Sequence, residues 1–137
     1  MILLDTNVLV WLIMGDTRLK PERRALIEDA RVEDGVRVSA ITAWEISMLV
    51  DKGRLDLRRE VSKWIEAVFS APGVRIASIS PAIAVDAGRL PGAIHGDPAD
   101  RLIIATAREL GCPLLTSDKK ILAYAAAGHV SVIDARL

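Results

Sequence analysis

Five acidic residues share one context, since each follows a short apolar run or stands in the first turn of an expected helix: Asp5, Glu45, Asp97, Asp100 and Asp118. If these carboxylates met at one place they would repel each other, and loss of water would add to the cost. A hard divalent cation with oxygen ligands removes that penalty. Mg²⁺ or Mn²⁺ suits such a set, whereas zinc would require a His or Cys cluster that the sequence lacks. A site of this kind can activate water for in-line attack on a phosphodiester.

Each acid taken alone also has a structural explanation at a helix start. Thr42 and Glu45 have the spacing of a capping box. Asp97 precedes a proline, which is typical of an N-cap, and Asp100 then suits the first turn because of the helix dipole. Asp118 can also be a cap. Only the joint pattern of all five favours a metal site over helix capping.

Apolar patterning predicts the elements that would position these acids. Strands are expected over residues 2–4, 36–40, 74–76, 114–116 and 130–133. Helices are expected over residues 6–15, 21–34, about 43–51, 59–69, 81–90, 98–110 and 119–126. This alternation predicts an α/β domain with a central parallel sheet and helices on both faces. Because the carboxyl ends of parallel strands lie at one edge, the acids that follow the strands are expected to converge there.

The expected helix over residues 59–69 carries an apolar stripe at helical spacing. Its members are Val61, Trp64, Ile65, Val68 and Phe69. Such a stripe packs against the core in most proteins, and a groove for a partner is the alternative. Both interpretations stay open on the sequence.

Composition indicates one globular domain over residues 1–137, with 51% hydrophobic residues and only 4% aromatic residues. The 18 basic and 18 acidic residues give a formal net charge of zero, which argues against binding of nucleic acid by bulk charge. A local basic patch remains compatible with an RNA substrate. Lys119 and Lys120 are the preferred candidates because they adjoin Asp118.

Two further features of the sequence indicate the cellular compartment of the protein. Cys112 is the only cysteine, which excludes an intramolecular disulfide and suits a reducing environment. The first basic residue is Arg18, so the amino terminus lacks the positive segment of a signal peptide. We expect a cytoplasmic protein that does not enter the membrane.

Four segments, in this order and spanning nearly the whole chain, resemble the acidic motifs of PIN-domain nucleases. They are LLDTNVL at 3–9, SAITAWEI at 39–46, HGDPADRLIIATA at 95–107 and LLTSD at 114–118. The third segment is similar to that of bacterial VapC-type toxins. Each motif is weak alone, but the four in order are specific.

The resemblance implies a PIN-like fold with about five parallel strands in the order 3-2-1-4-5. It implies an endoribonuclease that depends on Mg²⁺ or Mn²⁺ and acts as the toxin of a type II toxin–antitoxin pair. It further implies a homodimer that a small antitoxin inhibits. Transfer, ribosomal and messenger RNA all remain open as substrates.

Carried over by position, the resemblance assigns the metal and the chemistry to four carboxylates: Asp5, Glu45, Asp100 and Asp118. Asp97 is better explained as an N-cap than as a metal ligand. Thr6 and Thr116 are expected to hydrogen-bond the carboxylates or bound water. Arg101 is expected to pair with an acid or a phosphate, or to form a structural salt bridge. His95 is expected to have no role.

Three other kinds of protein share part of this pattern. A phospho-receiver module would have an adjacent acidic pair after the first strand, where this chain has Asp5-Thr6-Asn7. A phosphatase similar to haloacid dehalogenases would have a second aspartate in place of Asn7. The third rival is an inactive dimer of the same fold that only binds a partner. Its signature would be a missing acid, and none is missing.

Overall fold

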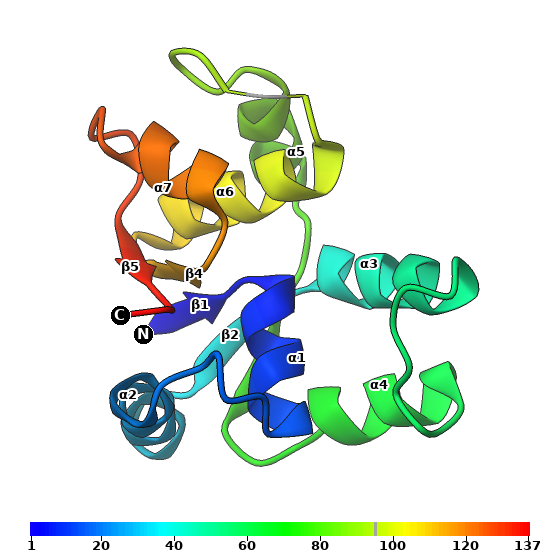
Figure 1. Cartoon of the computed structure of the whole chain (residues 1–137). Helices are drawn as coiled ribbons and strands as arrows, with labels where there is room; N and C mark the ends of the chain where they lie inside the picture. Colours follow the sequence, from blue (N-terminus) through cyan, green and yellow to red (C-terminus); the bar gives the residue numbers. More distant parts are fainter. Residues whose placement is uncertain (95) are drawn as a thin grey trace.

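The computed structural model describes residues 1–94 and 96–137. Its centre is a five-stranded sheet in the order β3-β2-β1-β4-β5, in which every neighbouring pair is parallel (Figure 1). The strands are β1 (Ile2–Leu4), β2 (Val36–Ser39), β3 (Val74–Ala77), β4 (Leu114–Thr116) and β5 (Val132–Asp134). The expected fold class and strand order are confirmed.

Seven helices in the described part of the chain connect the strands. They are α1 (Thr6–Met14), α2 (Pro21–Glu33), α3 (Ala40–Asp51), α4 (Val61–Phe69), α5 (Pro81–Gly88), α6 (Pro98–Leu110) and α7 (Lys119–Ala125). In Figure 1, α1, α2 and α4 lie on one side of the sheet and α5, α6 and α7 on the other. No helix within residues 1–94 and 96–137 is long and apolar enough to cross a membrane.

The hydrophobic core is divided by the sheet into two clusters, one on each face. Ile2 and Leu4 of β1 belong to the cluster under α1, α2 and α4, whereas Leu3 belongs to the cluster under α5, α6 and α7. Leu115 and Leu114 of β4 divide in the same way. Because side chains alternate along a strand and both faces are covered, these strands must be apolar throughout. This burial fixes the strand ends that carry the acidic residues.

Helix α3 begins three residues earlier than the sequence predicts. Ser39 is its N-cap, and the Ser39 side chain accepts a hydrogen bond from the Ile41 N–H at 3.2 Å. The capping box predicted from Thr42 and Glu45 is therefore wrong, since both residues lie inside the helix. The hydroxyl of Thr42 is used elsewhere, as described below.

The apolar stripe of α4 faces the core. Trp64 and Val68 are buried, and Val61, Ile65 and Phe69 pack against the same cluster. The strong amphipathic pattern thus reports ordinary packing onto the sheet. The packing of this stripe against the core is therefore confirmed, while contact of its half-buried members with a partner stays a prediction.

Candidate active site

Asp5 is the residue between β1 and α1, and it is only 4% exposed. Its Oδ1 accepts a hydrogen bond from the Thr6 N–H at 2.8 Å, and its Oδ2 accepts one from the Thr116 hydroxyl at 2.6 Å. Burial raises the pKa of Asp5 to about 6, and repulsion from Asp100 and Asp118 acts in the same direction. The two hydrogen bonds oppose this shift but do not cancel it. Hydrogen bonds thus hold the Asp5 carboxylate in one orientation, while its negative charge remains unfavourable in this buried position.

Glu45 lies in the second turn of α3 and is half-buried. Its Oε1 accepts a hydrogen bond from the Thr6 hydroxyl at 2.6 Å. Burial raises the pKa of Glu45 to about 7, while the hydrogen bond from Thr6 lowers it and repulsion from Asp5, Asp100 and Asp97 raises it. Thr6 therefore joins the two carboxylates, through its amide to Asp5 and through its hydroxyl to Glu45.

The remaining acids lie at the starts of α6 and α7. Asp97 is the N-cap of α6, and its Oδ1 accepts a hydrogen bond from the Asp100 N–H at 3.2 Å. Its predicted role as a cap is confirmed. Asp118 is the N-cap of α7, where its Oδ1 accepts from the N–H groups of Lys120 and Ile121 at 2.8 and 3.3 Å. Helix capping thus fixes both carboxylates at the same edge of the sheet as Asp5.

A surface hollow of about 650 Å³ joins these helix starts. Its lining residues are Gly96, Asp97, Asp100, Asp118, Lys119 and Lys120. The two lysines therefore face the same space as three of the acids. Together with the repulsions at Asp5 and Glu45, this shows that the structure brings all five acidic residues into one electrostatically coupled group.

Arg101 connects two helices. Its Nε donates a hydrogen bond to the carbonyl of Ala87 at 2.8 Å, which joins α6 to the end of α5. This contact is a hydrogen bond to a backbone carbonyl, so the expected pairing of Arg101 with an acid or a phosphate stays a prediction. His95 lies outside the described residues.

The carboxylate set fits a hard divalent cation by its chemistry, since all of its donors are oxygens. Across residues 1–94 and 96–137, no three His, Cys, Asp or Glu side chains are close enough to enclose an ion by themselves. Mg²⁺ is commonly held by one or two carboxylates together with water and substrate phosphate, so it does not require an all-protein cage. The residues present fit this open mode of binding.

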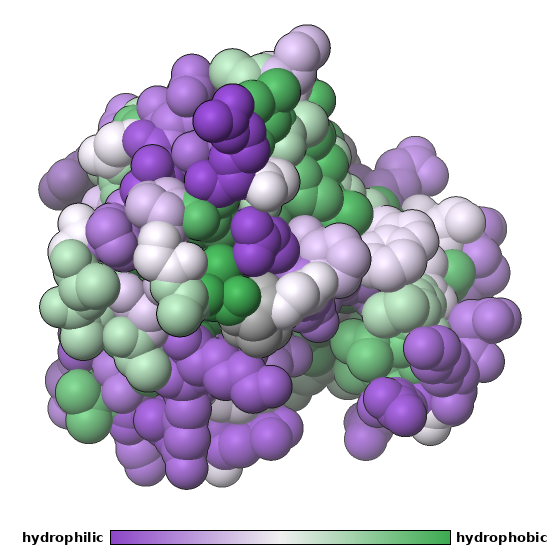
Figure 2. Space-filling view, turned by 90° about the horizontal axis from the view of Figure 1, so that it is seen from above, coloured by the Kyte–Doolittle hydropathy of each residue, from purple (hydrophilic) through white to green (hydrophobic). Residues whose placement is uncertain are grey.

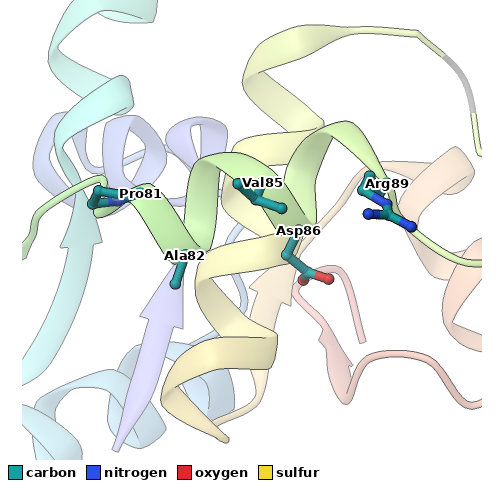
Figure 3. A pocket seen from close by; sticks show the side chains of 5 residues that line it. All are labelled: Pro81, Ala82, Val85, Asp86 and Arg89. Carbon is teal, nitrogen blue, oxygen red and sulfur yellow. The ribbon is translucent and has the colours of Figure 1, made fainter.

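A second hollow lies on the outer side of α5, with a volume of about 600 Å³. Figure 3 shows its lining residues, which are Pro81, Ala82, Val85, Asp86 and Arg89. The Asp86 carboxylate is bound to the Arg108 Nε at 2.8 Å. With one paired acid and an apolar lining, this hollow lacks the coupled carboxylates of the first.

The sequence interpretation missed one polar residue beside the acids. Thr42 is fully buried, and its hydroxyl lies 3.0 Å from the hydroxyl of Thr6. Local sequence gives no signal for this contact, because the two residues are 36 positions apart and Thr42 also fits a capping pattern. The contact depends on how α3 packs against α1.

Known proteins resemble this chain over nearly its whole length. The sequence model of the PIN domain family matches residues 2–127. The ribonuclease VapC22 of Mycobacterium tuberculosis (strain ATCC 25618 / H37Rv) is 37% identical over 123 residues, which are 90% of this chain and 91% of that protein.

Two solved structures share the fold. One is VapBC2 from Rickettsia felis bound to a DNA fragment from its promoter, with a TM-score of 0.71 at 18% identity. The other is a toxin–antitoxin complex from Klebsiella pneumoniae, with a TM-score of 0.67 at 21% identity. Each comparison covers 98% of both chains.

Proposed function

The chain belongs to the PIN-domain family, and on that premise we propose that it is a metal-dependent endoribonuclease that acts as the toxin of a toxin–antitoxin pair. The observation that carries this proposal is the group of five acids at one sheet edge, in which the pKa values of the buried Asp5 and the half-buried Glu45 are raised. Carboxylates kept at this electrostatic cost are typical of functional sites. The name of the 37% identical relative supports ribonuclease activity.

In this proposal Asp5, Glu45, Asp100 and Asp118 bind Mg²⁺ or Mn²⁺, one or two of them directly and the others through water. When bound, the cation lowers the pKa of water and stabilises charge on the phosphate. The chain positions its ligands before substrate arrives, because hydroxyl and amide hydrogen bonds fix Asp5 and Glu45. Lys119 and Lys120 line the same hollow and supply positive charge for the RNA backbone.

The proposal is tested by sequencing the RNA 5′ ends that appear when the chain is expressed. New ends should map to defined positions in one class of RNA and should be absent with an Asp5→Asn chain. Cleavage of a circular RNA by the purified chain with Mg²⁺, and its loss in EDTA, would establish an internal, metal-dependent cut. Purified chain that leaves all RNA intact with either cation would contradict the proposal.

For the antitoxin we propose a groove of about 400 Å³ on α1, α3 and the loop after α3. Its lining residues are Asn7, Val10, Trp11, Met14, Asp16, Arg18, Leu49, Arg54 and Leu55. This apolar lining with charged margins suits an amphipathic segment. Asn7 adjoins Thr6 in the chain, so we propose that a partner that fills the groove ends near the carboxylates. The toxin–antitoxin complexes among the structural neighbours support such a partner.

Met14→Glu tests this groove, since Met14 lines it and is 38% exposed. A charge on the apolar lining should weaken antitoxin binding about tenfold or more, while RNA cleavage stays within about twofold. The measurement is isothermal titration calorimetry with the purified antitoxin. Val32→Glu is the matched control, because Val32 is an exposed residue of α2 outside the lining. Equal affinity for both variants would contradict the assignment.

For the homodimer we propose the outer side of α5 as the contact between two copies. Val85 is 59% exposed there, and Ile79 and Ala82 are exposed beside it in the chain. Hydrophobic residues gather on part of the face in Figure 2, seen from the side on which α5, α6 and α7 lie in Figure 1. An exposed apolar patch of this kind is typical of a protein interface.

Val85→Arg is expected to shift the chain from dimer to monomer, because two-fold symmetry brings the introduced charges close together. Light scattering coupled to size exclusion at micromolar concentration measures the mass. Val32→Arg places the same charge on α2 and should leave the dimer intact. A Val85→Arg chain that remains dimeric would place the interface elsewhere.

A further inference from the structure

Thr42 combines complete burial with a position beside the acids. It is 0% exposed and lies three residues before Glu45, on the same face of α3. Because Ser39 caps this helix, the hydroxyl of Thr42 is not needed at the helix start. The structure directs it instead to the hydroxyl of Thr6, at 3.0 Å.

The direction of this hydrogen bond follows from the number of protons available. The Thr6 hydroxyl has one proton, and it donates that proton to Glu45 Oε1 at 2.6 Å. When Glu45 is ionised, as it is when it binds a cation, Thr6 must therefore accept from Thr42. The result is a chain of two hydrogen bonds, from Thr42 to Thr6 and from Thr6 to the Glu45 carboxylate, in which each bond polarises the next.

A second chain of two hydrogen bonds orients Asp5 in the same way. The Asp118 N–H donates to the Thr116 hydroxyl at 3.0 Å, and that hydroxyl donates to Asp5 Oδ2 at 2.6 Å. In each chain of hydrogen bonds a threonine hydroxyl donates to the carboxylate and accepts a hydrogen bond from another residue. Thr42 occupies for Glu45 the place that the Asp118 amide occupies for Asp5.

We propose that Thr42 is a positioning residue, which orients Glu45 through Thr6 for binding of the divalent cation; this rests on the proposed function. Removal of the Thr42 hydroxyl leaves Thr6 free to rotate away from Glu45. Residues that orient metal ligands in this way commonly change metal affinity by about tenfold or more when they are replaced.

The test compares Thr42→Val with Thr42→Ser. Valine keeps the shape and removes the hydroxyl, whereas serine keeps the hydroxyl. Thr106→Val is the matched control, because Thr106 is also 0% exposed and donates to a carbonyl of its own helix, that of Leu102 at 2.7 Å. Free Mn²⁺ is measured by electron paramagnetic resonance without RNA, and thermal unfolding verifies the fold of each variant.

Thr42→Val is expected to weaken Mn²⁺ binding about tenfold and to lower kcat for RNA cleavage, with KM unchanged. Thr42→Ser and Thr106→Val should bind Mn²⁺ within about twofold of the original chain. A double-mutant cycle that combines Thr42→Val with Thr6→Val tests whether the two residues act together on Mn²⁺ affinity. Because Thr42 acts through Thr6, the double variant should bind Mn²⁺ as the Thr6→Val chain does.

Two results would overturn the inference alone. One is unchanged Mn²⁺ affinity in a folded Thr42→Val chain. The other is an additive loss in the double variant, which would indicate that Thr42 acts through packing. An original chain that neither binds Mn²⁺ nor cleaves RNA would overturn the proposed function as well, so the two failures are distinguishable.

Discussion

The Asp5→Asn chain is expected to lose metal-dependent RNA cleavage by roughly 10³-fold or more, because one ligand of the cation contributes several kcal/mol to the transition state. The same loss is expected for Asp100→Asn. Asparagine keeps the size of aspartate but cannot supply the negative charge that the cation requires. The rate is measured with a fluorescent RNA at saturating Mg²⁺ and, separately, at saturating Mn²⁺.

The fold should survive Asp5→Asn. The asparagine oxygen can still accept the hydrogen bond from the Thr6 N–H that opens α1. The substitution also removes a buried charge, so the metal-free variant should unfold at the same or a higher temperature than the original chain at pH 8. Loss of activity together with retained stability separates a catalytic role from a structural one.

Asp29→Asn is the matched control, because Asp29 is an exposed residue of α2. It should cleave RNA at the original rate. A folded Asp5→Asn or Asp100→Asn chain with full activity would refute the carboxylate mechanism.

The metal-free chain is expected to lose stability as the pH rises from about 4 to about 7. The pKa of Asp5 in the folded chain is about 6 against an ordinary value of 3.8, so between these values the folded state binds more protons than the unfolded state. Stability therefore falls with rising pH, by about 3 kcal/mol from Asp5 alone once the pH exceeds 6. Glu45, with a pKa of about 7, extends the fall to neutral pH.

The half-buried Asp16 affects stability over a different pH range. Its pKa is lowered to about 2 by hydrogen bonds from Arg18, so its contribution is lost only as the pH falls below about 4. The loss of stability between pH 4 and 7 therefore reports the ionisation of Asp5 and Glu45.

Thermal unfolding in EDTA at several pH values measures this descent. A divalent cation binds the ionised carboxylates, so the rise in Tm at saturating Mn²⁺ should grow with pH over the same range. The Asp5→Asn chain should show a shallower descent without metal. A Tm in EDTA that rises steadily from pH 4 to 8 would contradict the assigned pKa shifts.

The sequence was sufficient for the parts of the fold that local patterns determine. The run Ile2 to Leu4 and the residues Leu114 and Leu115 are apolar because both faces of the sheet are covered, so the strands and the acids after them could be predicted. Asp97 before a proline predicted an N-cap, and the structure has one.

Other features depend on contacts between distant residues, which local patterns do not determine. Thr42 fits a capping box, yet Ser39 caps α3, and packing of α3 against α1 brings the Thr42 hydroxyl to Thr6. The stripe around Trp64 left packing on the sheet and contact with a partner open, and the tertiary arrangement shows the packing. The shared hydrogen bonds at Thr6 could not be predicted for the same reason.

Helix capping at the acidic edge has a consequence for how the chain could change over evolutionary time. Asp5, Asp97 and Asp118 each cap a helix, so a descendant that abandoned cleavage would still be selected for a capping side chain at these positions, where asparagine can replace Asp5. Glu45 lies in the second turn of α3, beyond the capping positions, and its burial is unfavourable without a cation. Under relaxed selection Glu45 should therefore be replaced first, which makes it the most informative single position for recognising inactive descendants.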